Sequence, residues 1–280
     1  MKVLPFKIPK PLNQNLIVQV DESKMFYNQL HQHEELQLSL VVRGSGKMIV
    51  GDSVHQFSAG DFFVIGSNCP HLFQSEESTE SVKMISLFFT SSSFGNDFFN
   101  LPDLSDLRSF FDQSTNGFSL TSNQLEVSEL MNEIPKQDKL TRFIKLLGLL
   151  KIVNKSERRV LTNFINPKKI GTRDGQRLQI VYDFVINNFQ NEISLNTVSE
   201  LVFMTPNAFC RFFKVRTNKT LFQFLIELRL EHACQLLQHS GLSIAEIAEQ
   251  SGFNSISNFN RQFKSQKGIS PSLFIKNNQA

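Results

Sequence analysis

The chain has 280 residues, a formal net charge of +3 and 40% hydrophobic residues. A chain of this length can form two cores of ordinary size, and its hydrophobic content excludes a fully disordered protein. The charge is too small to dictate a partner by itself. Three cysteines, Cys69, Cys210 and Cys234, are widely spaced and form no CxxC pair, which is typical of a reducing compartment.

Neither of two apolar stretches suggests export or membrane insertion. The amino-terminal segment MKVLPFKIPKPLNQ has no apolar core long enough for a signal peptide. The most hydrophobic stretch, FIKLLGLLKIV, is broken by lysines and is too short to cross a bilayer. We therefore expect a cytoplasmic protein with no membrane segment.

Residues 29–90 have a strand-like pattern. Short segments rich in β-branched or aromatic residues alternate with turn signals such as RGSG and SAGD. These segments are LQLSLVV, GKMIV, HQF, DFFVI and VKMISLFF. Short strands joined by glycine-containing turns favour a small antiparallel barrel or sandwich.

Residues 103–163 change to a helical period. Apolar residues recur there at spacings of three and four, which predicts one broad stripe along a helix. The stripe consists of Leu140, Phe143, Ile144, Leu147 and Leu150. It would either pack on the barrel of its own chain or seal a dimer, and the two roles are compatible because a long helix has two faces.

The segment NPKKIGTRDG, residues 166–175, contains Pro, two Gly and mixed charge without periodicity. It is predicted to be a linker. The chain then divides into an amino-terminal domain of residues 1–165 and an all-helical domain of residues 176–280.

The helical region repeats itself. The segment AFCRFFK, residues 208–214, aligns with NFNRQFK, residues 258–264, at an offset of 50. Upstream the match continues at an offset of 49, pairing Leu195 with Ile244, Val198 with Ile247 and Ser199 with Ala248. This pattern predicts two helix-turn-helix units, in each of which the second helix buries two phenylalanines against the first.

Charge is segregated in the same way in both copies. In the second copy Glu246 and Glu249 precede the turn, whereas Arg261 and Lys264 follow it. A helix that enters the DNA major groove needs hydrogen-bond donors, and a carboxylate there would be repelled. One such copy alone would indicate an amphipathic hairpin with a solvated face, but two copies in register favour DNA reading.

The connection between the copies, residues 220–237, has no Gly or Pro and a helical period. A helix of this length spans about 27 Å. A rod of that size can hold two recognition helices about one duplex turn, or about 34 Å, apart. One chain would then read two successive segments of the major groove.

The stretch SIAEIAEQSGFNSISNFNRQFKSQKGISPSLF, residues 243–274, resembles the signature of AraC/XylS-family transcription regulators. RLEHACQLL, residues 229–237, resembles the connecting helix of that family, and the resemblance covers about residues 174–276. It implies a sequence-specific DNA-binding transcription regulator that acts on an operator as a homodimer. An activator of this kind would also contact RNA polymerase.

One position departs from the family pattern. Phe203 stands where the second unit has Gly252, so we expect the first turn to close in a non-glycine conformation and to dock differently on DNA. Thr205 and Pro206 would then begin the next helix as its cap and first-turn proline.

The resemblance also implies which side chains contact DNA. The base-edge candidates are Asn207, Cys210, Arg211, Ser257, Asn260 and Arg261. The phosphate candidates are Lys214, Lys219, Lys264 and Lys267. Arg211 and Arg261 have an alternative role as partners of carboxylates in their own domain, and Cys210 has one as a packing residue.

The segment HQHEELQLSLVVRGSGKMIVGDSVHQFSAGDFFVIGSNCPHLF resembles the cupin-like barrel that precedes the DNA-binding region in many family members. The expected fold is therefore α+β, a cupin-like antiparallel barrel with helices followed by an all-α domain. The barrel would bind a small-molecule effector, with His31, His33, Gln37 and His71 in its pocket. Phe57, Phe63 and Phe73 would form either pocket wall or core.

A metal site is the other use of the histidines. In metal-binding cupins two His of an HxH motif, a Glu and a later His hold one ion. Here Gln37 occupies the position of the Glu, so we expect no metal and no cofactor. The alternative function is a metal-dependent cupin oxygenase or isomerase that uses His31, His33 and His71, but it leaves the helix-turn-helix units unexplained. We therefore expect a regulator and no enzyme.

Overall fold

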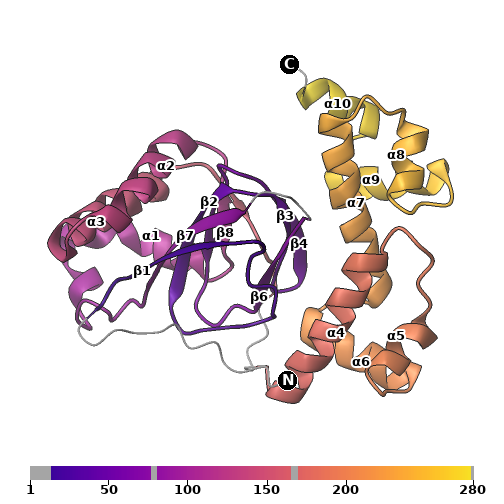
Figure 1. The fold of residues 1–280 in the computed structure, drawn as a ribbon, viewed down its shortest axis with the longest axis horizontal. Helices are drawn as coiled ribbons and strands as arrows, with labels where there is room; N and C mark the ends of the chain where they lie inside the picture. Colours follow the sequence, from indigo (N-terminus) through magenta and orange to yellow (C-terminus); the bar gives the residue numbers. More distant parts are fainter. Residues whose placement is uncertain (1–13, 77–80, 165–169, 279–280) are drawn as a thin grey trace. The chain divides into compact units, whose positions relative to one another are not determined.

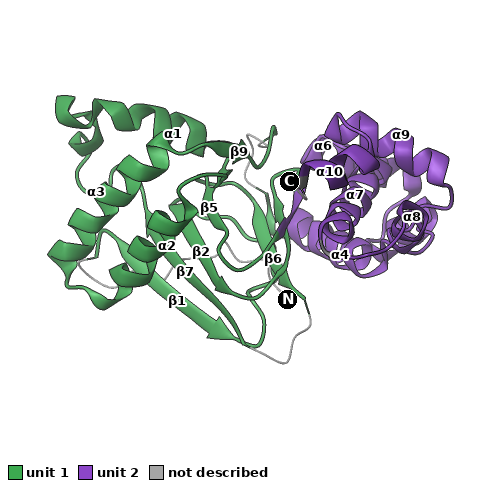
Figure 2. Cartoon of the chain, turned by 90° about the horizontal axis from the view of Figure 1, so that it is seen from above, with its two compact units in different colours: residues 1–53, 57–172 green, residues 54–56, 173–280 purple. Residues whose placement is uncertain are grey.

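The structure is a computed structural model that describes residues 14–76, 81–164 and 170–278. It contains two compact units, residues 1–53 with 57–172 and residues 54–56 with 173–280 (Figure 2). We call them the amino-terminal unit and the carboxyl-terminal unit and describe each by itself. Among the described residues, no helix is both long and apolar enough to span a membrane.

The amino-terminal unit is built on two antiparallel sheets (Figure 1). The larger sheet has the order β1-β7-β2-β5-β8-β9 and the smaller has the order β4-β3-β6. The strands are β1 (Ile17–Ser23), β2 (Leu36–Arg43), β3 (Gly46–Val50), β4 (Ser53–Phe57), β5 (Phe62–Ile65), β6 (His71–Ser75), β7 (Val82–Phe89), β8 (Phe118–Leu120) and β9 (Arg158–Val160). The predicted strand segments are confirmed as β2, β3, β4, β5 and β7.

Strand β2 shows how the sequence places a polar interior. Leu36, Leu38 and Leu40 belong to the core under the helices, whereas Val41 belongs to the core between the sheets. Because side chains alternate between the two faces of a strand, Gln37 and Ser39 point between the sheets. The polar residues of LQLSLVV therefore line the interior of the sandwich.

Helices cover the outer face of the larger sheet. They are η1 (Phe98–Asn100), η2 (Pro102–Leu107), α1 (Arg108–Ser114), α2 (Gln124–Glu133), η3 (Ile134–Lys136) and α3 (Lys139–Lys155). Leu146, Leu149 and Val153 of α3 share one apolar cluster with Leu38 and Leu87 of the sheet. This cluster fixes α3 on the sheet.

Two sequence-based expectations fail in this unit. The region 103–163 is not helical throughout, because β8 and β9 add to the edge of the larger sheet, with Phe63 opposite Ser119 and Phe118 opposite Val160. Strands of three residues are too short to show a period, and their pairing comes from tertiary contacts. Strands β1 and β6 were also not predicted.

The predicted apolar stripe of α3 is not its buried face. The fully buried residues of the helix are Leu146, Leu149, Leu150 and Val153. Leu140 and Ile144 are instead 68% and 59% exposed. The predicted stripe shares Leu150 with the core and packs Leu147 partly against it, while Leu140 and Ile144 face outward.

The carboxyl-terminal unit is helical. Its helices are α4 (Thr172–Asn188), α5 (Leu195–Leu201), α6 (Pro206–Thr217), α7 (Leu221–His239), α8 (Ile244–Gln250), α9 (Ile256–Lys267) and α10 (Pro271–Asn278). Helix α4 takes in the last four residues of the predicted linker, because helical contacts outweigh the moderate cost of one internal glycine, Gly175. Residues 165–169 lie outside the described residues.

The two predicted helix-turn-helix pairs are confirmed as α5 with α6 and α8 with α9. Phe209, Phe213, Phe259 and Phe263 are all buried to 1% exposure or less. Each recognition helix begins at a hydroxyl cap, since Thr205 accepts from the amide of Ala208, and Ser255 from that of Asn258. Helix α7 joins the pairs and spans about 28 Å.

The first turn corrects one prediction. Phe203 has φ +54° and Gly252 has φ +81°, so both turns pass through the left-handed region. Phe203 can adopt it because its φ lies in the small left-handed region open to residues with a Cβ. Thr205 and Pro206 begin α6 as predicted.

Candidate nucleic-acid interface and sandwich pocket

The outward faces of α6 and α9 are polar and exposed. All predicted base-edge candidates lie on these faces: Asn207, Cys210, Arg211, Ser257, Asn260 and Arg261. Arg261 donates from Nη2 to Oδ1 of Asn258 at 2.9 Å, an exposed bond that a base edge can replace. The buried phenylalanines hold each helix from behind, so these side chains present hydrogen-bonding groups to solvent.

The predicted phosphate contacts fall into two groups. Lys214 and Lys264 are exposed on the recognition helices. Lys219 pairs instead with Glu227 of α7 at 2.5 Å, and Lys267 pairs with Glu231 of α7 at 2.5 Å. Carboxylates of α7 thus hold the ammonium groups of both lysines within the unit.

A further cation of α6, Arg216, also has a partner inside the unit. Arg216 of α6 forms an ion pair with Asp174 of α4. This contact ties the first recognition helix to α4.

One of the two acidic residues of α8 has a structural role at the start of its helix. Glu246 accepts from the amide and hydroxyl of Ser243 at 2.8 and 2.7 Å, while the Ser243 hydroxyl caps the Glu246 amide. These hydrogen bonds hold the pKa of Glu246 below its ordinary value. The capping box explains why a carboxylate is retained in the first helix of the pair.

Inside the sandwich, Gln37 joins two of the predicted histidines. Its side-chain oxygen lies 3.1 Å from Nε2 of His33 and 3.0 Å from Nε2 of His71. Its amide nitrogen lies 2.8 Å from the Ser39 hydroxyl, which is 2.8 Å from that of Ser86. The predicted pocket residues are thus brought together by β2, β6 and the loop that precedes β2, and β7 adds Ser86.

The histidines are neutral near pH 7. Burial lowers the pKa of His31 to about 4 and also lowers that of His33 and, most strongly, of His71. His33 and His71 each place Nδ1 beside a backbone carbonyl, at 3.0 and 2.9 Å, so Nδ1 carries the proton and Nε2 a lone pair. A half rotation of the Gln37 amide then supplies the donor that both lone pairs need.

The same groups also fit a metal ion. One ring nitrogen of each of His31, His33 and His71 lies within 4.8 Å of the others, and all three residues are buried. Neutral imidazoles are ligands for first-row divalent ions, and the Gln37 oxygen would complete the set. The expectation of no metal stays a prediction.

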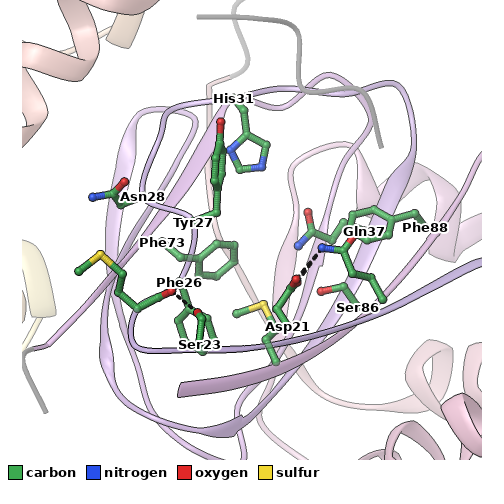
Figure 3. Close-up of a pocket in the computed structure, with 13 residues that line it drawn as sticks. Asp21, Ser23, Phe26, Tyr27, Asn28, His31, Gln37, Phe73, Ser86 and Phe88 are labelled. Atoms are coloured by element: carbon green, nitrogen blue, oxygen red, sulfur yellow. Dashed lines mark hydrogen bonds between the residues drawn. The ribbon is translucent and has the colours of Figure 1, made fainter. Parts of the chain in front are cut away.

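A pocket of about 450 Å³ opens beside this cluster (Figure 3). Its lining residues are Gln19, Asp21, Ser23, Met25, Phe26, Tyr27, Asn28, His31, Gln37, Phe73, Met84, Ser86 and Phe88. Figure 3 shows Asp21, Gln37 and Ser86 on one side and Tyr27 beside His31 on another. Phe73 lines the pocket and also belongs to the core, which contains Phe57 and Phe63.

The sequence-based prediction missed the contribution of β1. Gln19, Asp21 and Ser23 alternate along this strand and point to one side, and Gln19 donates to both carboxylate oxygens of Asp21 at 2.8 Å. The signal was present as a period of two in IVQVDES.

Comparison with known proteins matches both units. A helix-turn-helix domain family matches residues 198–277, and a cupin domain family matches residues 18–88. The transcriptional regulator YdeC of Bacillus subtilis is 21% identical, covering 90% of this chain and 87% of its own. The transcriptional activator RhaR of Cronobacter sakazakii is 24% identical, covering 87% of this chain and 85% of its own. The chain belongs to the AraC family of transcriptional regulators.

This AraC-family regulator therefore binds DNA, and its amino-terminal unit is a cupin sandwich. Its relatives are transcriptional regulators rather than enzymes, which confirms the expectation of a non-enzymatic protein. A solved structure of a regulator with an AraC-type DNA-binding domain, from Chromobacterium violaceum, is 24% identical, covers 37% of this chain and 92% of that chain, and has a TM-score of 0.35.

Proposed function

We propose that α6 and α9 read two successive major-groove segments of one operator. The observation that carries this proposal is the duplicated arrangement, in which each recognition helix buries two phenylalanines and exposes a polar face. Base contacts come from the six exposed candidates named above, and phosphate contacts from Lys214 and Lys264. Lys219 and Lys267 contribute to phosphate binding only after leaving their carboxylate partners.

Arg261→Ala is expected to weaken binding to a selected operator by about 1–3 kcal/mol, or about 5- to 150-fold in Kd. It should also relax the preference at one base pair, because the guanidinium contacts a base edge. Gel-shift titration of the full chain on matched and single-mismatch duplexes measures both effects. The control is Lys264→Ala, which should weaken all duplexes alike. Unchanged affinity of Arg261→Ala would remove Arg261 from the interface.

We propose that the sandwich pocket binds the effector, a small polar molecule that is neutral or positively charged. Asp21 is the charged side chain among the described lining residues, and hydroxyl, amide and imidazole groups supply the other polar contacts. A volume of about 450 Å³ suits a small-molecule ligand. Binding would favour one arrangement of the two units over another, and so change DNA binding.

Thermal unfolding with sets of uncharged polyols, amines and carboxylates tests this assignment. Saturating a site at 100 times Kd stabilises a protein by about 2.7 kcal/mol. We expect Asp21→Ala to abolish the shift caused by an active compound. The control is Glu22→Ala, because Glu22 pairs with Arg43 at 2.6 Å and Lys83 at 2.9 Å outside the pocket. Stabilisation by carboxylates alone would contradict the proposed charge preference.

We propose that the outer face of α3 forms a homodimer interface. Leu140 and Ile144 form an exposed apolar ridge. Hollows of about 400 and 410 Å³ flank this helix, one lined by Phe143 and the other by Leu147 and Gly148. A ridge beside hollows can fit its own copy across a two-fold axis.

Glutamate at both positions, Leu140→Glu with Ile144→Glu, is expected to convert a dimer into a folded monomer. Light scattering measures the mass, and circular dichroism checks the fold. The control is Leu125→Glu, a residue of α2 that is 75% exposed. A dimer that persists in the double variant would place the interface elsewhere.

We also propose a cytoplasmic location and, if the protein activates transcription, contact with RNA polymerase. The proposed domain limits are residues 1–165 and 176–280, with a connection between them. The regulatory function of the relatives supports the first two proposals, and the division of the chain into two compact units near residue 172 supports the domain limits.

A further inference from the structure

The segment that follows α4 lies between the two helix-turn-helix pairs. Helix α4 ends at Asn188, and the ring of Phe189 is buried with its centroid 5.0 Å from that of His232 on α7. The side chain of Gln190 donates to the backbone carbonyl of Gln250, the last residue of α8, at 2.7 Å. The segment that joins α4 to α5 of the first pair therefore contacts the second pair.

Arg229 of α7 holds the same segment by two hydrogen bonds. Its Nε donates to the carbonyl of Phe189 at 2.7 Å and its Nη2 to the carbonyl of Asn191 at 2.8 Å. Carbonyls just beyond a helix carry partial negative charge that favours a cation. The rigid fork of a guanidinium supplies both bonds in fixed directions, which an ammonium does not.

The turn of the second pair is pressed against this segment. A Cβ at Gly252 would lie 2.7 Å from the Phe189 carbonyl oxygen and 2.9 Å from Nε of Arg229. The matching residue of the first pair, Phe203, is 92% exposed. The contrast explains why the second turn needs a glycine while the first accepts a phenylalanine.

We propose that Arg229 fixes the orientation of the second helix-turn-helix on the first and thereby sets the base-pair spacing that the regulator accepts. This inference rests on the proposed reading of two segments of one duplex. Helix α7 alone limits the distance between the two recognition helices, α6 and α9. Its length does not fix the rotation of one recognition helix relative to the other. The contacts of Arg229 across residues 189–191 and the Gly252 turn fix that rotation.

Spacing is a sharp readout of this rotation. One inserted base pair moves a half-site by about 3.4 Å and turns it by about 35° around the duplex axis. A rigid pair of recognition helices tolerates one number of base pairs between the half-sites, whereas a pair with rotational freedom tolerates several. Arg229 is thus a positioning residue that contacts no DNA itself.

The test uses the full chain and a duplex selected by it from a random pool. Footprinting locates the two contacted segments, and insertion of one or two base pairs between them gives a spacing series. For the wild type we expect at least a tenfold loss of affinity per insertion. For Arg229→Lys and Arg229→Met we expect weaker binding to the selected duplex but a loss of threefold or less per insertion.

Two further variants keep the test decisive. Gln190→Ala removes the hydrogen bond to Gln250 and should reduce the spacing penalty. It takes the place of the Arg229 variants if they do not fold. Arg216→Gln removes the ion pair between α6 and α4, which involves neither residues 189–191 nor the second helix-turn-helix, and should leave the penalty unchanged. A wild-type penalty in Arg229→Met or, where that variant does not fold, in Gln190→Ala overturns the proposal.

The remaining outcomes separate this inference from the function on which it rests. A wild type that protects two segments but shows no spacing preference refutes the role of Arg229 and keeps the two-segment reading. A wild type that protects one segment refutes the two-segment reading itself.

Discussion

Lowering the pH from 7 to 5 is expected to destabilise the cupin sandwich by about 2 kcal/mol through His31 alone. Burial lowers the pKa of His31 to about 4, whereas in an unfolded chain it titrates near 6.5. Between these values the unfolded chain binds more protons than the folded one, so stability falls as the pH falls. At pH 5 the difference amounts to about 1.5 pH units at 1.36 kcal/mol each.

The other two histidines of this site act in the same direction, whereas Asp61, elsewhere in the unit, does not. His33 and His71 also have lowered pKa values, chiefly because they are buried, and each adds a loss below pH 6.5. Asp61 acts in the opposite direction, because burial raises its pKa and protonation relieves that penalty. The net expectation is a loss of stability that begins near pH 6.5 and continues towards pH 4.

Hydrogen exchange with a chelator present measures this effect locally. The strands β2 and β6 should lose protection between pH 7 and pH 5 after correction for the intrinsic exchange rate. The helices α8 and α9, which contain no histidine, serve as an internal control. His31→Gln should reduce the slope with pH, and a wild-type slope in that variant would assign the effect to other groups.

The sequence predicted the fold where its signals were local. Strand segments with alternating residues and the two copies of Phe-x-Arg-x-Phe-Lys needed no tertiary information. Strands β8 and β9 failed because three residues show no period and their partners lie far away in the chain. The sequence could not decide between core and dimer for the stripe of α3 for a related reason, since a helix with apolar residues on several faces does not reveal which face meets the sheet.

The sequence predicted which residues form the candidate sites, but not which hydrogen bonds and ion pairs join them. The sequence named His31, His33, Gln37 and His71 as one cluster, and the structure joins His33 and His71 through Gln37. It also named Lys219 and Lys267 as DNA contacts, although carboxylates of α7 pair with both. Those pairs join residues 8 and 36 positions apart, and the longer one follows from the tertiary packing of α7 against α9.

Phe259→Ala is expected to lower the stability of the second helix-turn-helix by about 3–5 kcal/mol. Its ring is fully buried, 5.2 Å by centroid from that of Phe253 and 5.6 Å from that of Phe263, so truncation leaves a cavity between α8 and α9. Operator affinity should fall further than in Arg261→Ala, because the whole recognition helix loses its support. Hydrogen exchange in α8 and α9 measures the stability and gel-shift titration the affinity.

Hydrogen exchange in α4 after Phe259→Ala shows how far the second helix-turn-helix is coupled to the rest of the unit. If the contacts of Arg229 form one rigid body, Phe259→Ala also weakens protection in α4 near Asn188, because the Gln250 and Gly252 turn that packs there is released. If they do not, the loss stays within α8 and α9. Phe222→Ala, at a residue of α7 that is 47% exposed, is the control and should change stability by less than about 0.5 kcal/mol. A change in Phe259→Ala as small as in this control would mean that the ring is not part of a packed core.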